Sequence, residues 1–400
     1  MNNIKNYKNL IFLSLIGIPI GVVVGILDTI FGKVLLKITD IRQQFPLFLI
    51  PFLALSGVII VYCYNKFGGK ASKGMSLIFE VAQNKEEKIP LRLIPFIILS
   101  TWLTHLFGGS AGREGVAVQI GATFSNWVSQ KINIQNANKI FLITGMSAGF
   151  AGLFQTPIAA IFFAIEVLIA GAIHYGAILP AITASFTAST VSHLLGLEKF
   201  TFYLSSNINL DFTTILKLII LGIIFGLVGG SFAVCLKYIK SFFTNKINNP
   251  IKRIFVISII LSIIFLILHK GRYSGLGTNL INASFYNEQI YYYDWILKFI
   301  LTIFTLSIGF QGGEVTPLFS IGASLGVILA TMFNLPIEFV AGLGYLSVFG
   351  SATNTFLAPI FIGGEVFGYE YMPFYFIIMV FAYTFNFNKS IYSLQQSNNL

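Results

Sequence analysis

Residues 108–122 read GGSAGREGVAVQIGA and set two ionisable residues, Arg113 and Glu114, among glycines in a chain that is otherwise mostly apolar. A charged side chain inside a membrane is costly unless it faces a cavity, a partner or a transported ion, so Glu114 is a candidate site residue. The apolar stretch at residues 116–127 predicts a helix that begins near Glu114. Free N–H groups at such a helix start attract anions, and the glycines let the backbone approach the anion closely.

Composition indicates a polytopic membrane protein. Of the 400 residues, 56% are hydrophobic and 10% are charged, whereas roughly a quarter of the residues are charged in soluble domains. The net charge of +10 does not indicate a nucleic-acid partner, because the basic residues form short clusters between apolar runs. Such clusters mark cytoplasmic loops, so Lys5 and Lys8 predict a cytoplasmic N-terminus. We expect a multi-pass protein of the cell inner (plasma) membrane, surrounded by lipids.

Apolar segments recur along the chain, and many are shorter than the ~20 residues that a simple span requires. The first, at residues 10–31, lacks a small-x-small cleavage site and predicts a retained helix. The others lie at about 46–64, 91–107, 115–129, 138–153, 156–173, 177–196, 214–236, 252–268, 295–310, 315–333, 337–350, 355–367 and 372–385. Short segments broken by Gly and Pro indicate helices that stop inside the membrane around a cavity. The predicted fold class is all-α, with tilted and broken helices.

Three motifs occur twice in the same order, which predicts an internal repeat, although Gly-Ala and Pro-Ile pairs also recur by chance in apolar chains. The paired stretches are KGMSLI (73–78) with LGTNLI (276–281), GREGVAVQIGA (112–122) with GGEVTPLFSIGA (312–323), and FQTPI (154–158) with FLAPI (356–360). The repeat halves are expected at about residues 10–196 and 210–396, within a single transmembrane transport domain, 1–400, that has no cytoplasmic regulatory domain. In an inverted repeat, half-helix N-termini point at one midplane site, and each is equivalent to about half a positive charge, which favours an anion.

Glu114 is the candidate gate. An ionised carboxylate beside a helix-terminal anion site can occupy that site itself and vacate it when protonated, so it would couple an anion to a proton. The alternative is a static helix cap, or a partner of Arg113, because carboxylates favour helix N-termini. Arg113 is interpreted as a structural pairing residue.

Other polar or unusual residues fall at matching places in the two halves. Met75 follows Gly74 at the start of a short helix, where it is either core filler or a site residue, and Phe79 one turn later is a possible aromatic contact. Glu314 and Thr316 stand at the equivalent of Glu114 in the second half, where they either line an ion path or cap a helix.

The remaining candidates favour structural roles. Glu166 and Glu365 end apolar runs and are interpreted as hydrogen-bonding groups, and Cys63 and Cys235 as small buried hydrophobes. The four histidines have no metal-ligand spacing, so neither a metal site nor a cofactor is predicted. The short loops carry no nucleophile elbow, phosphate loop or paired-carboxylate pattern, which argues against an enzyme.

With GREG at residues 112–115 and GGEVTP at 312–317, the chain resembles the CLC family of chloride channels and anion/proton exchangers. The resemblance spans about residues 10–396. It implies a homodimer of inverted-repeat protomers, each with its own ion path. Members of the family carry G-K/R-E-G-P, G-S-G-I-P and G-G-x-F-x-P segments.

The departures from these segments resemble the fluoride/proton antiporter branch. Val116 replaces the Pro after GREG, Met75 replaces the chloride-binding Ser, and GGEVTP replaces G-G-x-F-x-P. The resemblance implies that Glu114 is the gating and proton-coupling glutamate. It also implies that an anion is bound by Gly74, Met75, Gly112, Gly115, Val116 and Tyr392. The ion path in the second repeat would then be lined by Glu314, Val315 and Thr316.

One further departure concerns protons. Chloride/proton exchangers of the family carry an inner glutamate directly after the position of Glu166, where this chain has Val167. Either Glu114 swings far enough to deliver its proton inward, or the chain is a passive channel; the fluoride branch favours the former. The predicted function is a fluoride/proton antiporter that exports cytoplasmic fluoride and is driven by the inward proton gradient. The alternatives are a CLC-type chloride channel or chloride/proton exchanger and, from another class, a membrane-embedded enzyme or scaffold.

Overall fold

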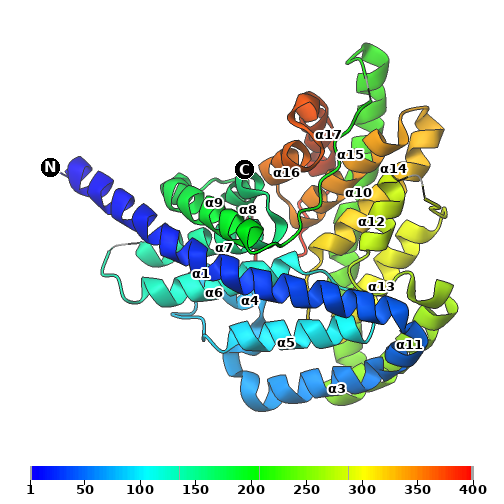
Figure 1. Ribbon diagram of the computed structural model, residues 1–400, viewed down its shortest axis with the longest axis horizontal. Helices are drawn as coiled ribbons and strands as arrows, with labels where there is room; N and C mark the ends of the chain where they lie inside the picture. The colour runs from blue at the N-terminus through cyan, green and yellow to red at the C-terminus, as the bar shows by residue number, and fades with distance from the viewer. Residues whose placement is uncertain (1, 135, 207, 287, 398–400) are drawn as a thin grey trace.

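The computed structural model describes residues 2–134, 136–206, 208–286 and 288–397 and is almost entirely helical (Figure 1). The α-helices are α1 (Asn2–Gln44), α2 (Pro46–Leu49), α3 (Leu53–Cys63), α4 (Met75–Ala82), α5 (Leu93–Leu106), α6 (Glu114–Ser129), α7 (Ala137–Phe154), α8 (Pro157–Glu166), α9 (Ile178–Leu194), α10 (Phe212–Lys246), α11 (Pro250–Ile267), α12 (Thr278–Phe285), α13 (Asp294–Ile308), α14 (Val315–Phe333), α15 (Ile337–Thr353), α16 (Leu357–Phe367) and α17 (Met372–Thr384). Short helical turns join them at η1 (Ile50–Phe52), η2 (Tyr64–Gly68), η3 (Gly69–Lys73), η4 (Tyr175–Ala177), η5 (His269–Gly271) and η6 (Tyr369–Tyr371).

The apolar segments of the sequence correspond to most of these helices, with three differences in length. Helices α4 and α12 lie outside the predicted segments, and the segment at 46–64 is divided among α2, η1 and α3. Helix α1 has 43 residues and continues well past the apolar run that ends at Phe31, and α10 continues ten residues past residue 236, to Lys246. Charged residues such as Lys33 and Lys37 prolong α1 because they are good helix formers. Helix α8 ends at Glu166 and is therefore shorter than the predicted segment, which extends to residue 173. The Glu166 carboxylate accepts a hydrogen bond from Ala358 N at the start of α16.

Six helical stretches among the described residues are long and apolar enough to cross a membrane. They are Tyr7–Gln44, Pro46–Ala82, Ala137–Phe154, Phe212–Lys246, Pro250–Ile267 and Val315–Phe333. Shorter apolar helices, including α5, α8, α15 and α16, lie among them. The prediction of helices that stop inside the membrane therefore agrees with the helix lengths.

Glycines let the helices near the centre pack with their backbones in contact. On α6, a side chain at Gly121 would collide with the carbonyl oxygen of Gly145 on α7. Gly322 of α14 stands in the same relation to Gly344 of α15. These two helix pairs carry Glu114 and Glu314 at the starts of α6 and α14, so the tight packing fixes both helix starts.

Helix α1 lies across one side of the molecule next to α9, and α10 to α17 form the other side (Figure 1). Gly17, Gly21 and Gly25 of α1 lie against the backbone of α9. Strands are minimal in the described chain: β1 (Ile169–Ala170) pairs in parallel with β2 (Gln396–Ser397).

The α6–α7 contact supports a stability prediction. Gly121→Leu should lower the melting temperature of the purified protein by several degrees, because overpacking a tight contact costs about 1–3 kcal/mol or more. Gly176→Leu is the matched control, since nothing lies within 4 Å of a side chain placed there. Equal melting temperatures for the two variants would contradict the close helix contact.

Candidate functional site

Two helices begin side by side at the centre of the molecule: α6 at Glu114 and α14 at Val315. The segments that precede them are paired, because Gly112 N donates to Gly313 O (2.5 Å) and Gly313 N donates to Gly112 O (2.8 Å). A side chain at Gly112 would lie 2.9 Å from Pro317 Cδ, so only glycine permits this approach. The pairing satisfies backbone groups that would otherwise be exposed inside a membrane.

The Glu114 carboxylate lies at the N-terminus of the other helix, α14. Its Oε2 accepts hydrogen bonds from Thr316 Oγ1 (2.5 Å), Thr316 N (3.1 Å) and Arg113 N (3.3 Å). The side chain is 1% exposed. A carboxylate therefore occupies the position where a helix N-terminus would hold an anion.

Arg113 is the nearest cation, and its contact with Glu114 is loose. Its Nε lies 3.6 Å from Glu114 Oε1 without a hydrogen bond, and its Nε and Nη1 are buried without a hydrogen-bond partner. The pairing expected from the sequence is present as a weak contact. The backbone and Thr316, more than Arg113, hold the carboxylate.

A cavity of about 500 Å³ opens beside these helix starts. Six of the predicted site residues line it: Gly74, Met75, Phe79, Gly115, Glu314 and Tyr392. Glu114 and Thr316 are not among the lining residues; they meet behind its wall. Most of the predicted residues thus fall into a cavity set or the buried pair of Glu114 and Thr316, and Gly112, Val116 and Val315 lie outside both.

Aromatic contacts fix the cavity wall at Tyr392. Its ring lies 5.4 Å from the ring of Phe79 and 6.4 Å from that of Phe163, measured between centroids. Half-buried Met75 lies at the start of α4, whose N-cap Gly74 has a φ of 54°. This left-handed conformation is suited to glycine and leaves the first turn of α4 open to the cavity.

Glu314 mirrors Glu114 in position but faces the cavity. Its Oε2 lies 4.0 Å from the Cβ that a side chain at Gly115 would have, so Glu314 lies beside the start of α6. Each segment therefore places its glutamate near the helix start of the other. Only Glu314 reaches the cavity.

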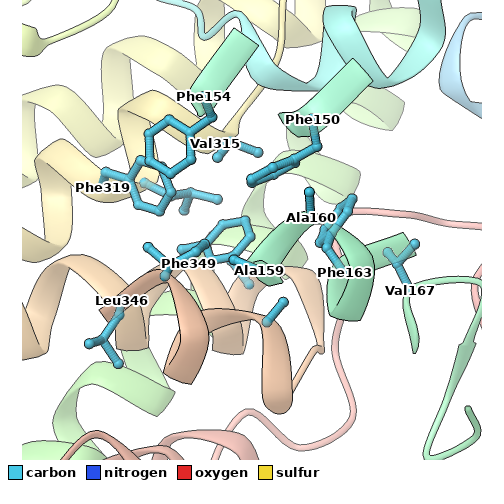
Figure 2. Packing of buried hydrophobic residues seen from close by; sticks show 14 of the residues in the cluster. Phe150, Phe154, Ala159, Ala160, Phe163, Val167, Val315, Phe319, Leu346 and Phe349 are labelled. Carbon is cyan, nitrogen blue, oxygen red and sulfur yellow. The ribbon is translucent and has the colours of Figure 1, made fainter. Parts of the chain in front are cut away.

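Three valines fall in the core instead of the cavity. Val116 and Val315, which follow the two helix starts, are 0% and 1% exposed. Val167 is likewise buried and lies past the end of α8 beside Phe163, among packed side chains that include Phe150 (Figure 2). Val167 has no titratable group and is fully buried, so its side chain cannot take part in proton transfer.

Sequence reasoning missed several cavity residues. Gln119, four residues after Gly115, lines the cavity and keeps a buried Oε1 that lacks a hydrogen-bond partner. A lone amide in an apolar helix was the signal for it. Lys237 and Lys240, near the end of α10, also line the cavity and, with Lys73 and Arg253, make its charge positive.

The structural interpretation of Glu166 and Glu365 is confirmed. Glu166 accepts from the N–H groups of Phe356, Leu357 and Ala358 at the start of α16 (2.8–3.2 Å). Glu365 accepts from two N–H groups at the start of α8 (2.8 and 3.1 Å). Helices α8 and α16 thus cap one another reciprocally.

Within the described chain, no cluster of three or more His, Cys, Asp or Glu side chains is arranged to hold a metal ion.

The division into a cavity set and a buried pair predicts thiol reactivity. In a background in which Cys63 and Cys235 are alanine, Ser76→Cys should react rapidly with a water-soluble thiol reagent, because Ser76 lines the cavity. Thr316→Cys should react far more slowly, because Thr316 is 4% exposed. Mass spectrometry of timed samples measures both, and similar rates would show that the cavity does not end where we place it.

Comparisons with known proteins show the family of this chain. The family model described as voltage gated chloride channel matches residues 56–386. A chloride/fluoride channel protein of Pseudomonas syringae pv. tomato is 31% identical over 392 residues, which cover 96% of this chain and 86% of that protein.

Two solved structures give the same fold. A CLC-type fluoride/proton antiporter has a TM-score of 0.96 and 53% identity, covering 98% of this chain and 99% of that one. A slow cyanobacterial Cl⁻/H⁺ antiporter, at 19% identity, has a TM-score of 0.80 and covers 94% of each chain. With a family match over most of its length and the two paired Gly-rich helix starts at its centre, the chain belongs to the CLC family of membrane transport proteins.

Proposed function

We propose that this protein is a fluoride/proton antiporter that exports fluoride against its gradient by admitting protons. The single observation that carries the proposal is the Glu114 carboxylate at the start of α14, where Thr316 N and Oγ1 donate to it as they would to an anion. The fluoride/proton antiporter to which the chain is 53% identical, and the chloride/fluoride channel protein to which it is 31% identical, support this choice of ions.

Exchange follows from competition for one position. While Glu114 is ionised, its oxygen takes the hydrogen bonds of Thr316, and a free anion cannot. Protonation removes the charge that favours a helix N-terminus, so the side chain leaves and an anion enters. Each departure of the anion is then linked to the return, and hence the deprotonation, of Glu114.

Fluoride suits donors of this kind. It is small and strongly hydrated, so its site must supply close hydrogen-bond donors in place of water, and backbone N–H groups at Gly-flanked helix starts can do so. The cavity brings Met75 and Tyr392 together at the start of α4. We assign Met75, Tyr392 and the glycines Gly74, Gly112 and Gly115 to the anion path, with Val116 as the buried support of the α6 start.

The proton needs a route other than Val167. Glu314 is a carboxylate that lines the cavity beside Gly115, in the segment paired with that of Glu114. We expect Glu114 to pass its proton to Glu314 when its carboxyl group swings toward the cavity. We therefore assign Glu314 to proton transfer as well as to the second-repeat path with Val315 and Thr316.

The remaining expectations belong to the same proposal. The chain is a transporter, not an enzyme. We propose two inverted repeat halves, a homodimer with one path per protomer, and a place in the cell inner (plasma) membrane with a cytoplasmic N-terminus. The reciprocal capping of α8 and α16 and the pairing of Gly112 with Gly313 support the repeat.

A chloride channel or exchanger is the second candidate, favoured by the description of the family model. It predicts chloride flux equal to fluoride flux, and no change in either for Met75→Ser. The fluoride proposal predicts that Met75→Ser raises chloride flux relative to fluoride flux, because a hydroxyl donor then joins the cavity wall. Fluoride- and chloride-selective electrodes on the same proteoliposomes distinguish the two.

Glu114→Gln should abolish proton-driven fluoride movement, because the amide cannot exchange a proton. A fluoride electrode records fluoride movement across proteoliposomes with and without a pH gradient. Glu198→Gln, which changes an exposed carboxylate, is the matched control and should behave as the wild type does. Unchanged proton-driven transport in Glu114→Gln would overturn the mechanism.

Thr316→Val should loosen the coupling of protons to fluoride. It removes the 2.5 Å hydroxyl bond to Glu114, and a hydrogen bond to a charged group contributes about 1.5–3 kcal/mol. Thr316→Ser keeps the hydroxyl and should restore the wild-type ratio of protons to fluoride, recorded in parallel by pH and fluoride electrodes. If Val and Ser variants couple equally, the hydroxyl does not hold the gate.

A further inference from the structure

A second cavity, of about 350 Å³, lies at the end of α1 opposite its N-terminus. Its lining includes three cationic side chains, Arg42, Lys270 and Arg272, with His269 beside them, and no carboxylate. We propose that this cavity is a second anion site, which takes a small inorganic anion and, in the exporting protein, receives fluoride on the outer side. This inference rests on the proposed function, which supplies the ion and the direction.

Arg42 is the buried cation of the cavity. It is 3% exposed, and its Nη1 donates to the carbonyl oxygen of His105 (2.8 Å). Among the described residues it makes no ion pair within 4 Å, and its acidic neighbour Asp40 is exposed. A buried charge without a partner is costly, and a bound ion of opposite charge would lower that cost. The remaining N–H donors of a guanidinium that lines a cavity can bind an anion.

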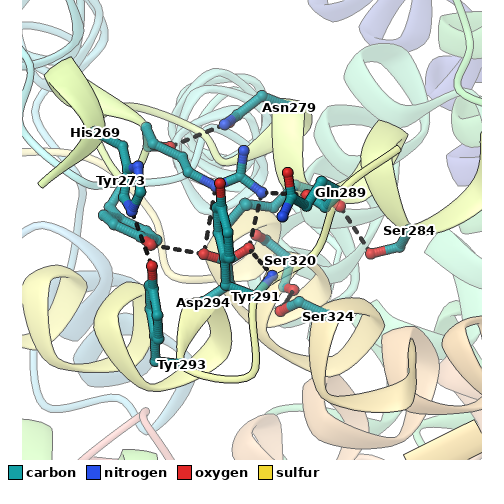
Figure 3. Close-up of polar contacts among 12 residues, drawn as sticks. His269, Tyr273, Asn279, Ser284, Gln289, Tyr291, Tyr293, Asp294, Ser320 and Ser324 are labelled. Carbon is teal, nitrogen blue, oxygen red and sulfur yellow. Dashed lines mark hydrogen bonds and ion pairs between the residues drawn. The ribbon is translucent and has the colours of Figure 1, made fainter. Parts of the chain in front are cut away.

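The charge of Arg272, in contrast, is already neutralised. Asp294, which is fully buried, accepts from Arg272 Nη2 (2.8 Å), Tyr273 Oη (2.6 Å) and Tyr291 N (2.9 Å). These contacts surround Asp294 in Figure 3. They make a rigid wall, so the net positive charge available to a ligand comes from Arg42 and Lys270.

The positive charge continues inward toward Glu114. Lys298 is 0% exposed, and its Nζ donates to Gly275 O (2.7 Å), Ser110 Oγ (2.9 Å) and Tyr273 O (3.2 Å) without forming an ion pair within the described chain. Ser110 lies four residues before Glu114. Lys298 thus places one buried positive charge between the second cavity, through Gly275 beside Arg42, and the segment that carries Glu114.

The cavity is also the counterpart of the first one in the proposed inverted repeat. The first cavity includes Gly74 at the start of α4 and the end of α10, and the second lies beside the matching start of α12 and the end of α1. Gly275, with a φ of 65°, keeps room there, because a side chain would collide with the Arg42 guanidinium. In an inverted repeat, two cavities related in this way would open on opposite sides of the membrane.

Lys270 allows a test that spares the buried residues. Its φ of 50° suits asparagine, so Lys270→Asn removes the charge without straining the turn, and Lys270→Glu reverses it. Lys37→Gln is the matched control, because Lys37 is exposed on the same half of α1 outside the cavity. The measurement is the half-saturating outer fluoride concentration in proteoliposomes. Proteoliposomes contain the protein in both orientations. Molecules whose first cavity faces the external solution are inactivated by a membrane-impermeant thiol reagent that reacts with Ser76→Cys.

Lys270→Asn should raise the half-saturating outer fluoride concentration roughly three- to tenfold at low ionic strength. Lys270→Glu should raise this concentration further, because it places a negative charge in the cavity. The maximal rate should change little, and about 0.5 M of an inert salt should shrink the difference through screening. Values equal to those of Lys37→Gln would overturn the second site while leaving the exchange itself intact. Absence of fluoride exchange in the unsubstituted protein would instead refute the proposed function.

A crystal soaked in bromide provides a second, independent measurement. Bromide within hydrogen-bonding distance of Arg42, lost in Lys270→Asn, is the result that we expect. A cavity without bromide in the unsubstituted protein would overturn the proposal.

Discussion

The backbone pairing of Gly112 with Gly313 is the constraint on which the centre of this protein depends. Helices that stop inside a membrane leave N–H and C=O groups without partners, and lipid offers none. Here the two broken segments satisfy each other, and glycine is required because any side chain would keep them apart. Since the pairing joins the start of α6 to the start of α14, two positive helix ends share one small region.

That arrangement explains why carboxylates cross between the halves of the chain. Glu114 lies at the start of α14, and Glu314 beside the start of α6. Farther out, Glu166 caps α16 and Glu365 caps α8. The outer pair is engaged by backbone N–H groups and is structural. In the inner pair, Glu314 lines the cavity, and Glu114 lies behind the cavity wall, bonded to Thr316.

The sequence predicted the helices well and the spatial contacts only in part. Apolar runs located most of the helices, but not the extension of α1 to Gln44. The residues after Phe31 are more polar and still have a high helix propensity, so the helix continues past the apolar run. Repeated motifs brought Glu114 and Thr316 to one site. Nothing local signals that Glu166 reaches α16, 190 residues away, or that Arg42 lines a cavity with Lys270. Such contacts depend on how distant helices pack.

The central claim is that fluoride and protons move in opposite directions through one site. Its most direct test loads proteoliposomes with fluoride at equal internal and external pH and follows protons with a pH-sensitive dye while the membrane potential is clamped. The account predicts that outward fluoride movement drives protons inward and acidifies the interior, and that an equal chloride gradient drives far less. Fluoride efflux without proton entry would contradict it.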